Sequence, residues 1–244
     1  MAADVSWIRQ EQATAWAFGR TLRDNLLDAY RRQYGLTAAP PPAKIIDELL
    51  TDFLHVELRH EPLPLDRFAE TRWGDERAVV TINSRTREIP GVRHPEGVEN
   101  VGKWHEAVHV ARDLDVLRRE RPPGLPGFDA ATAIVCLRSG KRSLFQADKA
   151  REFWAEEASR AATVSMSALR QSEAFRRLSH MAPRSLGPAP EAWPLLYQAA
   201  EDIGVNISAL VKQLTLESWI VVVREGGRER VYIQPALAEL LEAS

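Results

Sequence analysis

His105-Glu106-Ala107-Val108-His109 is the stretch of this 244-residue chain that indicates most about its fold and its chemistry. Residues four positions apart share one face of a helix, so His105 and His109 can bind the same metal ion. Glu106 lies beside them, placed to take a proton from a water molecule held at that metal. The pattern predicts a helix with a zinc site that hydrolyses peptide bonds. The alternative is a chance match on an ordinary amphipathic helix.

The composition is typical of a soluble globular protein. Hydrophobic residues make up 45% of the chain and charged residues 27%, and the length suits one large domain or two smaller ones. The net charge of -2 gives no general attraction to nucleic acid or anionic membranes. No apolar run approaches the roughly 20 residues of a membrane helix, and the first residues have no signal-peptide core. With Cys136 as the only cysteine, we expect a cytoplasmic protein without membrane partners.

The hydrophobic pattern and the prolines divide the chain into four parts. They are an N-terminal helical extension and linker (1–43), a metallopeptidase core (44–181), a proline-rich linker (182–194) and a C-terminal domain (195–244). Within the core, the pattern predicts three helices and three strands. The expected helices span 44–53, 98–118 and 144–177, and the expected strands span 54–59, 78–83 and 132–138.

The C-terminal part has the layout of a small winged helix-turn-helix domain. A helix over 195–202 is followed by a tight turn, and Ser208 is the expected N-cap of a second helix that ends at Leu216. Two strands at 220–224 and 230–234 should pair as a hairpin around Gly226-Gly227. The expected fold class is therefore α+β, with a zincin-like core followed by a winged helix-turn-helix-like segment.

A third metal ligand is expected on the long helix downstream, because catalytic zinc sites usually have three protein ligands and one open position. At about 100° per residue, Glu157 shares its face with apolar side chains, while Glu152 and Glu156 lie on the opposite or flanking side. A carboxylate within an apolar stripe is costly without a partner. A metal ion would supply that partner and make Glu157 the third ligand. The alternative is a buried ion pair with Arg160 or another basic residue.

Other polar residues near the motif are weaker candidates. His94, Arg93 and Arg85 are candidates for binding substrate or stabilising an oxyanion, although His94 also fits an ordinary loop histidine. Asp113 or Asp115 could orient a ligand imidazole through its free ring N–H, and the alternative for both is a solvated charge near a helix end.

Three segments, in order, resemble the ImmA/IrrE-type metallopeptidases. They are a strand that ends in Ile82-Asn83, the His105–His109 motif, and Glu157-Ala158-Ser159-Arg160-Ala161-Ala162-Thr163-Val164-Ser165-Met166. The last is similar to the family's Glu-Ala-Asn-x-Phe-Ala-Ala-x-Leu-Leu-Met segment, whose Glu completes the zinc site. The resemblance covers roughly 54–234. It implies that His105, His109 and Glu157 hold zinc, and that the substrate is a DNA-binding repressor protein whose cleavage releases a stress-response or mobile-element operon.

The leading hypothesis is a zinc-dependent endopeptidase that acts as a monomer or homodimer, with Mn²⁺ or Fe²⁺ as less favoured metals. The competing hypothesis is a winged-helix transcription regulator, or an interaction protein, with a degenerate peptidase domain. Residues 191–244 carry four basic and eight acidic side chains, and four minus eight gives -4. Because DNA binding needs clustered Lys and Arg, docking of a protein is favoured over direct DNA binding.

Overall fold

The computed structural model is an α+β protein of two compact units, Met1–Thr163 (unit 1) and Val164–Ser244 (unit 2). It describes the backbone of residues 6–74, 76–119, 134–137, 146–181, 189 and 191–237, and the side chains of 10–74, 76–113, 150–181, 189 and 191–237. Residues 164–181, expected in the metallopeptidase core, group with the C-terminal unit instead. Most of the expected linker at 182–194 lies outside the described residues. None of the described helices is long and apolar enough to cross a membrane.

Unit 1 contains a four-stranded mixed sheet with the order β1-β3-β2-β4. Its strands are β1 (Glu57–Glu61), β2 (Arg67–Trp73), β3 (Ala78–Asn83) and β4 (Ile134–Leu137). β1 runs parallel to β3, whereas β2 is antiparallel to both β3 and β4. The six residues of β3 are all buried, and its bounds agree with the sequence prediction. β2 was not predicted, because only Ala69 and Thr71 of its seven residues are fully buried and charged residues flank them.

The helix that carries the HExxH motif, α3 (Pro95–Arg119), packs on one face of this sheet. Trp104 and Ala107 of α3 share a buried core with Ala69 of β2 and with Val80 and Ile82 of β3. Burying apolar surface stabilises this contact by about 25 cal/mol per Å². The motif therefore lies on a helix that is firmly packed against the sheet. Short helical segments also belong to unit 1: α2 (Ile46–Glu48), the π-helical turn η1 (Leu49–Phe53) and the 3-10 turn η2 (Thr86–Glu88).

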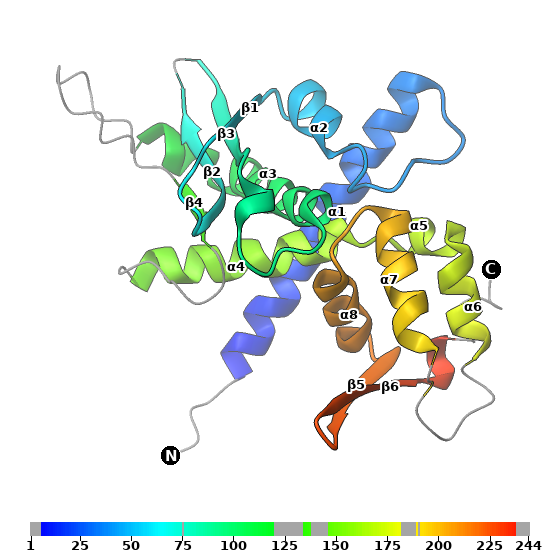
Figure 1. Cartoon of the computed structure of the whole chain (residues 1–244). Coiled ribbons are helices and arrows are strands. Elements are labelled where there is room, and N and C mark those ends of the chain that lie inside the picture. The colour runs from blue at the N-terminus through cyan, green and yellow to red at the C-terminus, as the bar shows by residue number, and fades with distance from the viewer. Residues whose placement is uncertain are drawn as a thin grey trace. The chain divides into compact units, whose positions relative to one another are not determined.

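A second long helix, α4 (Gln146–Thr163), packs against α3 on one side and against the N-terminal helix α1 (Ser6–Tyr34) on the other (Figure 1). α1 and α4 lie close together at Gly19, where a Cβ atom would lie 2.0 Å from the carbonyl oxygen of Ala158. Phe18 and Trp154 make an edge-to-face contact with ring centroids 5.0 Å apart. α4 is therefore buried on two faces.

The single helix predicted over 144–177 is in fact three helices: α4, α5 (Met166–Gln171) and α6 (Glu173–His180). Ser165 and Ser172 each have extended backbone and cap the helix that follows. The Ser165 hydroxyl accepts a hydrogen bond from the Ala168 N–H at 3.3 Å, and the Ser172 hydroxyl accepts one from the Phe175 N–H at 3.2 Å. These caps satisfy N–H groups that a new helix leaves open, which explains why the chain restarts twice.

Unit 2 continues with α7 (Ala192–Ile203), α8 (Ile207–Leu216) and a hairpin of β5 (Ile220–Glu225) and β6 (Arg228–Ile233). Gly204, with φ of 77°, ends α7 in the left-handed conformation that glycine adopts without strain. Asn206 caps α8 by accepting from the Ala209 N–H at 2.7 Å, so the predicted cap at Ser208 is wrong by two positions. The hairpin turns at Gly226-Gly227, as predicted, and both residues have positive φ.

Candidate metal centre

The two histidines of the motif point at one another from the same face of α3. The Nε2 atoms of His105 and His109 are 3.0 Å apart, and the two residues are 6% and 0% exposed. Two imidazole nitrogens at hydrogen-bond distance can share at most one proton in their neutral forms, which leaves a lone pair free on at least one of them. This pairing follows from the helical spacing of four residues that the sequence showed.

Glu152 of α4 completes a cluster of three potential metal ligands. One of its carboxylate oxygens lies 3.2 Å from Nε2 of His105 and the other lies 3.3 Å from Nε2 of His109. A tetrahedral zinc ion at about 2.0–2.1 Å from each ligand would separate the ligand atoms by roughly 3.3 Å, so the observed spacing fits such an ion. Among the described residues, His105, His109 and Glu152 form a group of His and carboxylate side chains that could hold a metal ion.

Glu157, the predicted third ligand, lies outside this group of potential metal ligands. Glu157 is 2% exposed and forms the alternative that the sequence left open, an ion pair with Arg160. Its other oxygen accepts hydrogen bonds from the side-chain amide of Gln12 at 2.7 Å and from the indole N–H of Trp16 at 3.0 Å. Glu157 thus ties α4 to α1, while Glu152 faces the histidines.

The helical-face argument considered one buried side of α4, whereas α4 has two neighbouring helices. α4 packs against both α1 and α3, so a buried carboxylate can lie on either of two faces. Glu152 and Glu157 are five residues apart, which separates them by about 140° around the helix and about 7.5 Å along it. Ala158, the residue after Glu157, packs its backbone against Gly19 of α1. No single-helix pattern distinguishes the face toward α3 from the face toward α1.

Asp113 orients His109 from one turn further along α3. Its Oδ2 lies 2.8 Å from Nδ1 of His109, and Asp113 itself is 6% exposed. If Nδ1–H donates to Asp113, Nε2 keeps its lone pair for a metal, which is the usual role of a carboxylate behind a histidine ligand. Of the two aspartates considered from the sequence, Asp113 contacts His109, and the side chain of Asp115 lies outside the described residues.

The charges of this cluster reinforce one another. Burial by itself would raise the pKa of Glu152, but hydrogen bonds with His105 and His109 outweigh it and bring that pKa down to about 2. Burial by itself would lower the pKa of His109, but its contacts with Asp113 and Glu152 outweigh it and raise that pKa. Ionised Glu152 is the form that binds a cation, so the carboxylate is ready for a metal ion at neutral pH.

Glu106 lies on the sheet side of the motif and is fully buried. Its Oε2 accepts a hydrogen bond of 2.5 Å from the hydroxyl of Thr71, while its Oε1 is buried with no hydrogen-bond partner among the described residues. Burial raises the pKa of Glu106 to about 8, against the lowering effects of His105 and Thr71. A buried carboxylate oxygen without a partner among the described residues, next to histidines that could hold a metal ion, fits a site that takes a cation and a water molecule.

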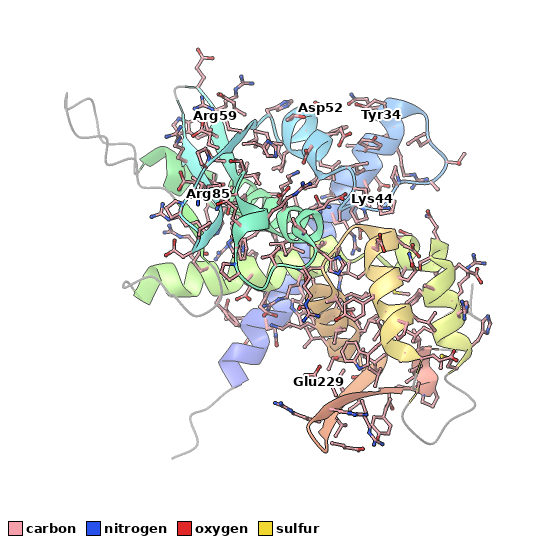
Figure 2. All side chains as sticks on the ribbon, viewed as in Figure 1. Tyr34, Lys44, Asp52, Arg59, Arg85 and Glu229 are labelled. Carbon is pink, nitrogen blue, oxygen red and sulfur yellow. The ribbon has the colours of Figure 1, made fainter. Side chains whose placement is uncertain are left out.

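The weaker candidates from the sequence are Arg85, Arg93 and His94. Arg85, labelled in Figure 2, follows β3 and pairs with Glu88 at 2.6 Å through its guanidinium group. Arg93 and His94 are exposed in the segment that precedes α3. His94 is not part of the group of potential metal ligands among the described residues.

Comparison with known proteins gives no matching family model, no matching curated protein and no matching solved structure. The functional argument therefore depends on the residues themselves. They bring together two imidazoles, one ionised carboxylate, an aspartate behind one imidazole and a second carboxylate with an unpaired oxygen.

Proposed function

We propose that this chain is a zinc-dependent endopeptidase of the ImmA/IrrE type, with His105, His109 and Glu152 as the metal ligands. The observation that carries the proposal is the convergence of two Nε2 atoms and one carboxylate within 3.0–3.3 Å of each other, next to the buried Glu106 of the same motif. Three protein ligands leave a fourth position open, which is typical of catalytic rather than structural zinc.

Each residue then has a distinct task. When bound, Zn²⁺ would polarise the scissile carbonyl and lower the pKa of water toward about 7. Oε1 of Glu106 would take a proton from the attacking water and give it to the leaving amine. Asp113 would hold the His109 ring so that Nε2 faces the metal. In this interpretation unit 1 is a zincin-like core, in which α3 carries the motif and α4 supplies the third ligand.

The substrate that we propose is a protein, namely a DNA-binding repressor in the cytoplasm, as the resemblance of the motif segments implies. The proposed ligand set departs from that resemblance at one point. Glu152 takes the role that the resemblance gives to Glu157, and Glu157 instead binds Arg160, Gln12 and Trp16. The ligand that we propose thus lies five residues earlier on α4 than the Glu-Ala segment suggests.

The test is cleavage of a fluorescence-quenched peptide library by the full-length zinc-loaded protein, with the Glu106→Gln variant as the control. We expect cleavage by the wild type and its loss in the variant, which keeps all three ligands and should still bind zinc. Cleavage retained by Glu106→Gln at equal zinc content would contradict the proposed mechanism.

A second candidate function is transcription regulation through unit 2. The order α7, short turn, α8 and hairpin is the layout of a winged helix-turn-helix domain. Its charge argues against DNA as the partner, because Arg230 of the hairpin lies 3.3 Å from Glu225 and Lys212 is the only basic residue of α8. We therefore assign this unit to docking of a protein. Sub-micromolar affinity for a labelled DNA duplex at physiological salt would favour the regulator instead.

A further inference from the structure

Thr71 of β2 makes the hydrogen bond that fixes the carboxylate of Glu106. The hydroxyl of Thr71 donates to Oε2 of Glu106 at 2.5 Å, and both residues are fully buried. The bond joins two elements far apart in the sequence, because β2 belongs to the sheet and Glu106 to α3. Thr71 occupies one oxygen of the carboxylate, and the other oxygen, Oε1, has no hydrogen-bond partner within the part of the chain that the structure describes.

We propose that Thr71 is a positioning residue for the hydrolysis, holding Oε2 of Glu106 so that Oε1 remains turned toward the attacking water. The inference rests on the proposed peptidase function. A glutamate side chain has several rotatable bonds, and a general base must stay within hydrogen-bond reach of the proton it removes. A group that fixes the base before the reaction saves the entropy of ordering it in the transition state.

The position of Thr71 suits this task because its strand cannot shift easily. β2 lies inside the sheet, where Thr71 is paired with Val80 of β3 on one side and with Ile134 of β4 on the other. Ala69, two residues before Thr71, lies in the buried core shared with Trp104 and Ala107 of α3. Strand alternation places Thr71 on that same face, toward the helix. A hydroxyl on a strand held from both sides is a more precise anchor than one on a loop.

A purely structural role makes a different prediction. If Thr71 only satisfied a buried oxygen, its loss would lower stability and leave the turnover of the folded protein unchanged. The two roles are separated by Thr71→Val, which keeps the β-branched shape and removes the hydroxyl, and Thr71→Ser, which keeps the hydroxyl and removes the methyl group. Thr81→Val is the matched control, because Thr81 is a buried threonine of β3 on the other face of the sheet, opposite Glu70.

The first measurement is kcat and KM of the full-length zinc-loaded protein on the best-cleaved peptide of the quenched library, at matched zinc content. We expect Thr71→Val to lose about 10- to 100-fold in kcat with KM unchanged, since the base is affected and not peptide binding. The kcat of Thr71→Ser should lie within about threefold of the wild-type kcat, and the kcat of Thr81→Val should equal the wild-type kcat. Full kcat in Thr71→Val, while the wild type cleaves, would overturn the role of Thr71 alone. A wild type that binds zinc and cleaves no peptide would overturn both this role and the proposed function.

The second measurement needs neither metal nor substrate. Infrared difference spectra of the metal-free wild type against Glu106→Gln isolate the carboxyl band of Glu106. Removing the donor should displace that band in Thr71→Val, and Thr71→Ser should restore its position. An unchanged band in Thr71→Val would show that the hydroxyl does not hold Glu106 and would overturn the inference, whatever the activity.

Discussion

Replacing Glu106 with glutamine should change the stability of the metal-free protein in a pH-dependent way, with the balance shifting in favour of the variant as the pH rises. Glu106 is fully buried with one oxygen unpaired, and burial is the main cause that raises its pKa from 4.5 to about 8. Between these two values the folded protein holds a proton that the unfolded chain has released. Raising the pH through this window therefore removes stability from the wild type. Glutamine carries no charge at any pH and lacks this dependence.

The size of the effect follows from the pKa. Each unit of pKa difference between the folded and unfolded states corresponds to about 1.36 kcal/mol. The raised pKa of Glu106 therefore lowers the free energy of unfolding by about 3 kcal/mol at pH 7 but only about 1 kcal/mol at pH 5. The glutamine amide keeps an oxygen for Thr71 and places an unpaired N–H₂ where Oε1 was, which costs about 1–3 kcal/mol. That cost does not depend on pH. The informative quantity is therefore how the difference in free energy of unfolding between the two proteins changes with pH.

Urea unfolding followed by tryptophan fluorescence, with EDTA present, measures this difference from pH 5 to pH 8. The free energy of unfolding of Glu106→Gln minus that of the wild type should rise by about 2–3 kcal/mol between pH 5 and pH 7. The histidines and Glu152 are present in both proteins, so their own titration cancels to first order. Parallel pH profiles for the two proteins would refute the argument that burial destabilises the charged Glu106.

Three further substitutions test the surroundings of the site. In an ordinary helix, Gly19→Ala would stabilise the protein by about 1 kcal/mol. Here the new Cβ would lie 2.0 Å from the carbonyl oxygen of Ala158, so the melting temperature should fall. A higher melting temperature would contradict the close packing of α1 on α4. Asn83→Ala removes four hydrogen bonds between the Asn83 side chain and backbone groups. The free energy of unfolding, measured in urea, should fall by about 2–4 kcal/mol. A change near zero would show that these bonds contribute little to stability. Asp113→Asn should lower the zinc affinity about 10- to 100-fold in a chelator competition, because His109 would no longer be held in one orientation. An unchanged zinc affinity would show that Asp113 has no role in the metal centre.

Local patterns in the sequence were sufficient for much of this fold. Helical spacing predicted the pairing of His105 with His109, the β-branched run at 78–83 predicted β3, and Gly226-Gly227 predicted the hairpin turn. In each case the determining interaction lies within a few residues along the chain. The α+β class followed from the same signals.

What the sequence left undecided depends on contacts between distant segments. The choice between Glu152 and Glu157 is made by α1 and α3, which cover two faces of α4. β2 carries charged residues on its less buried face and is recognisable mainly by its pairing with β3 and β4. The helix ends at Ser165 and Ser172 are not visible in the helical pattern of the sequence. Each serine is the N-cap of a new helix, which only its capping chemistry indicates.

The measurement that tests the central claim most directly is the zinc content and zinc affinity of Glu152→Gln beside Glu157→Gln, with far-UV circular dichroism to establish that both are folded. The metal centre described above predicts about one zinc ion per wild-type chain. It predicts that Glu152→Gln loses this ion, and that Glu157→Gln retains it while becoming less stable, because Glu157 binds Arg160, Gln12 and Trp16 instead of metal. Zinc retained by Glu152→Gln and lost from Glu157→Gln would contradict the assignment of the third ligand.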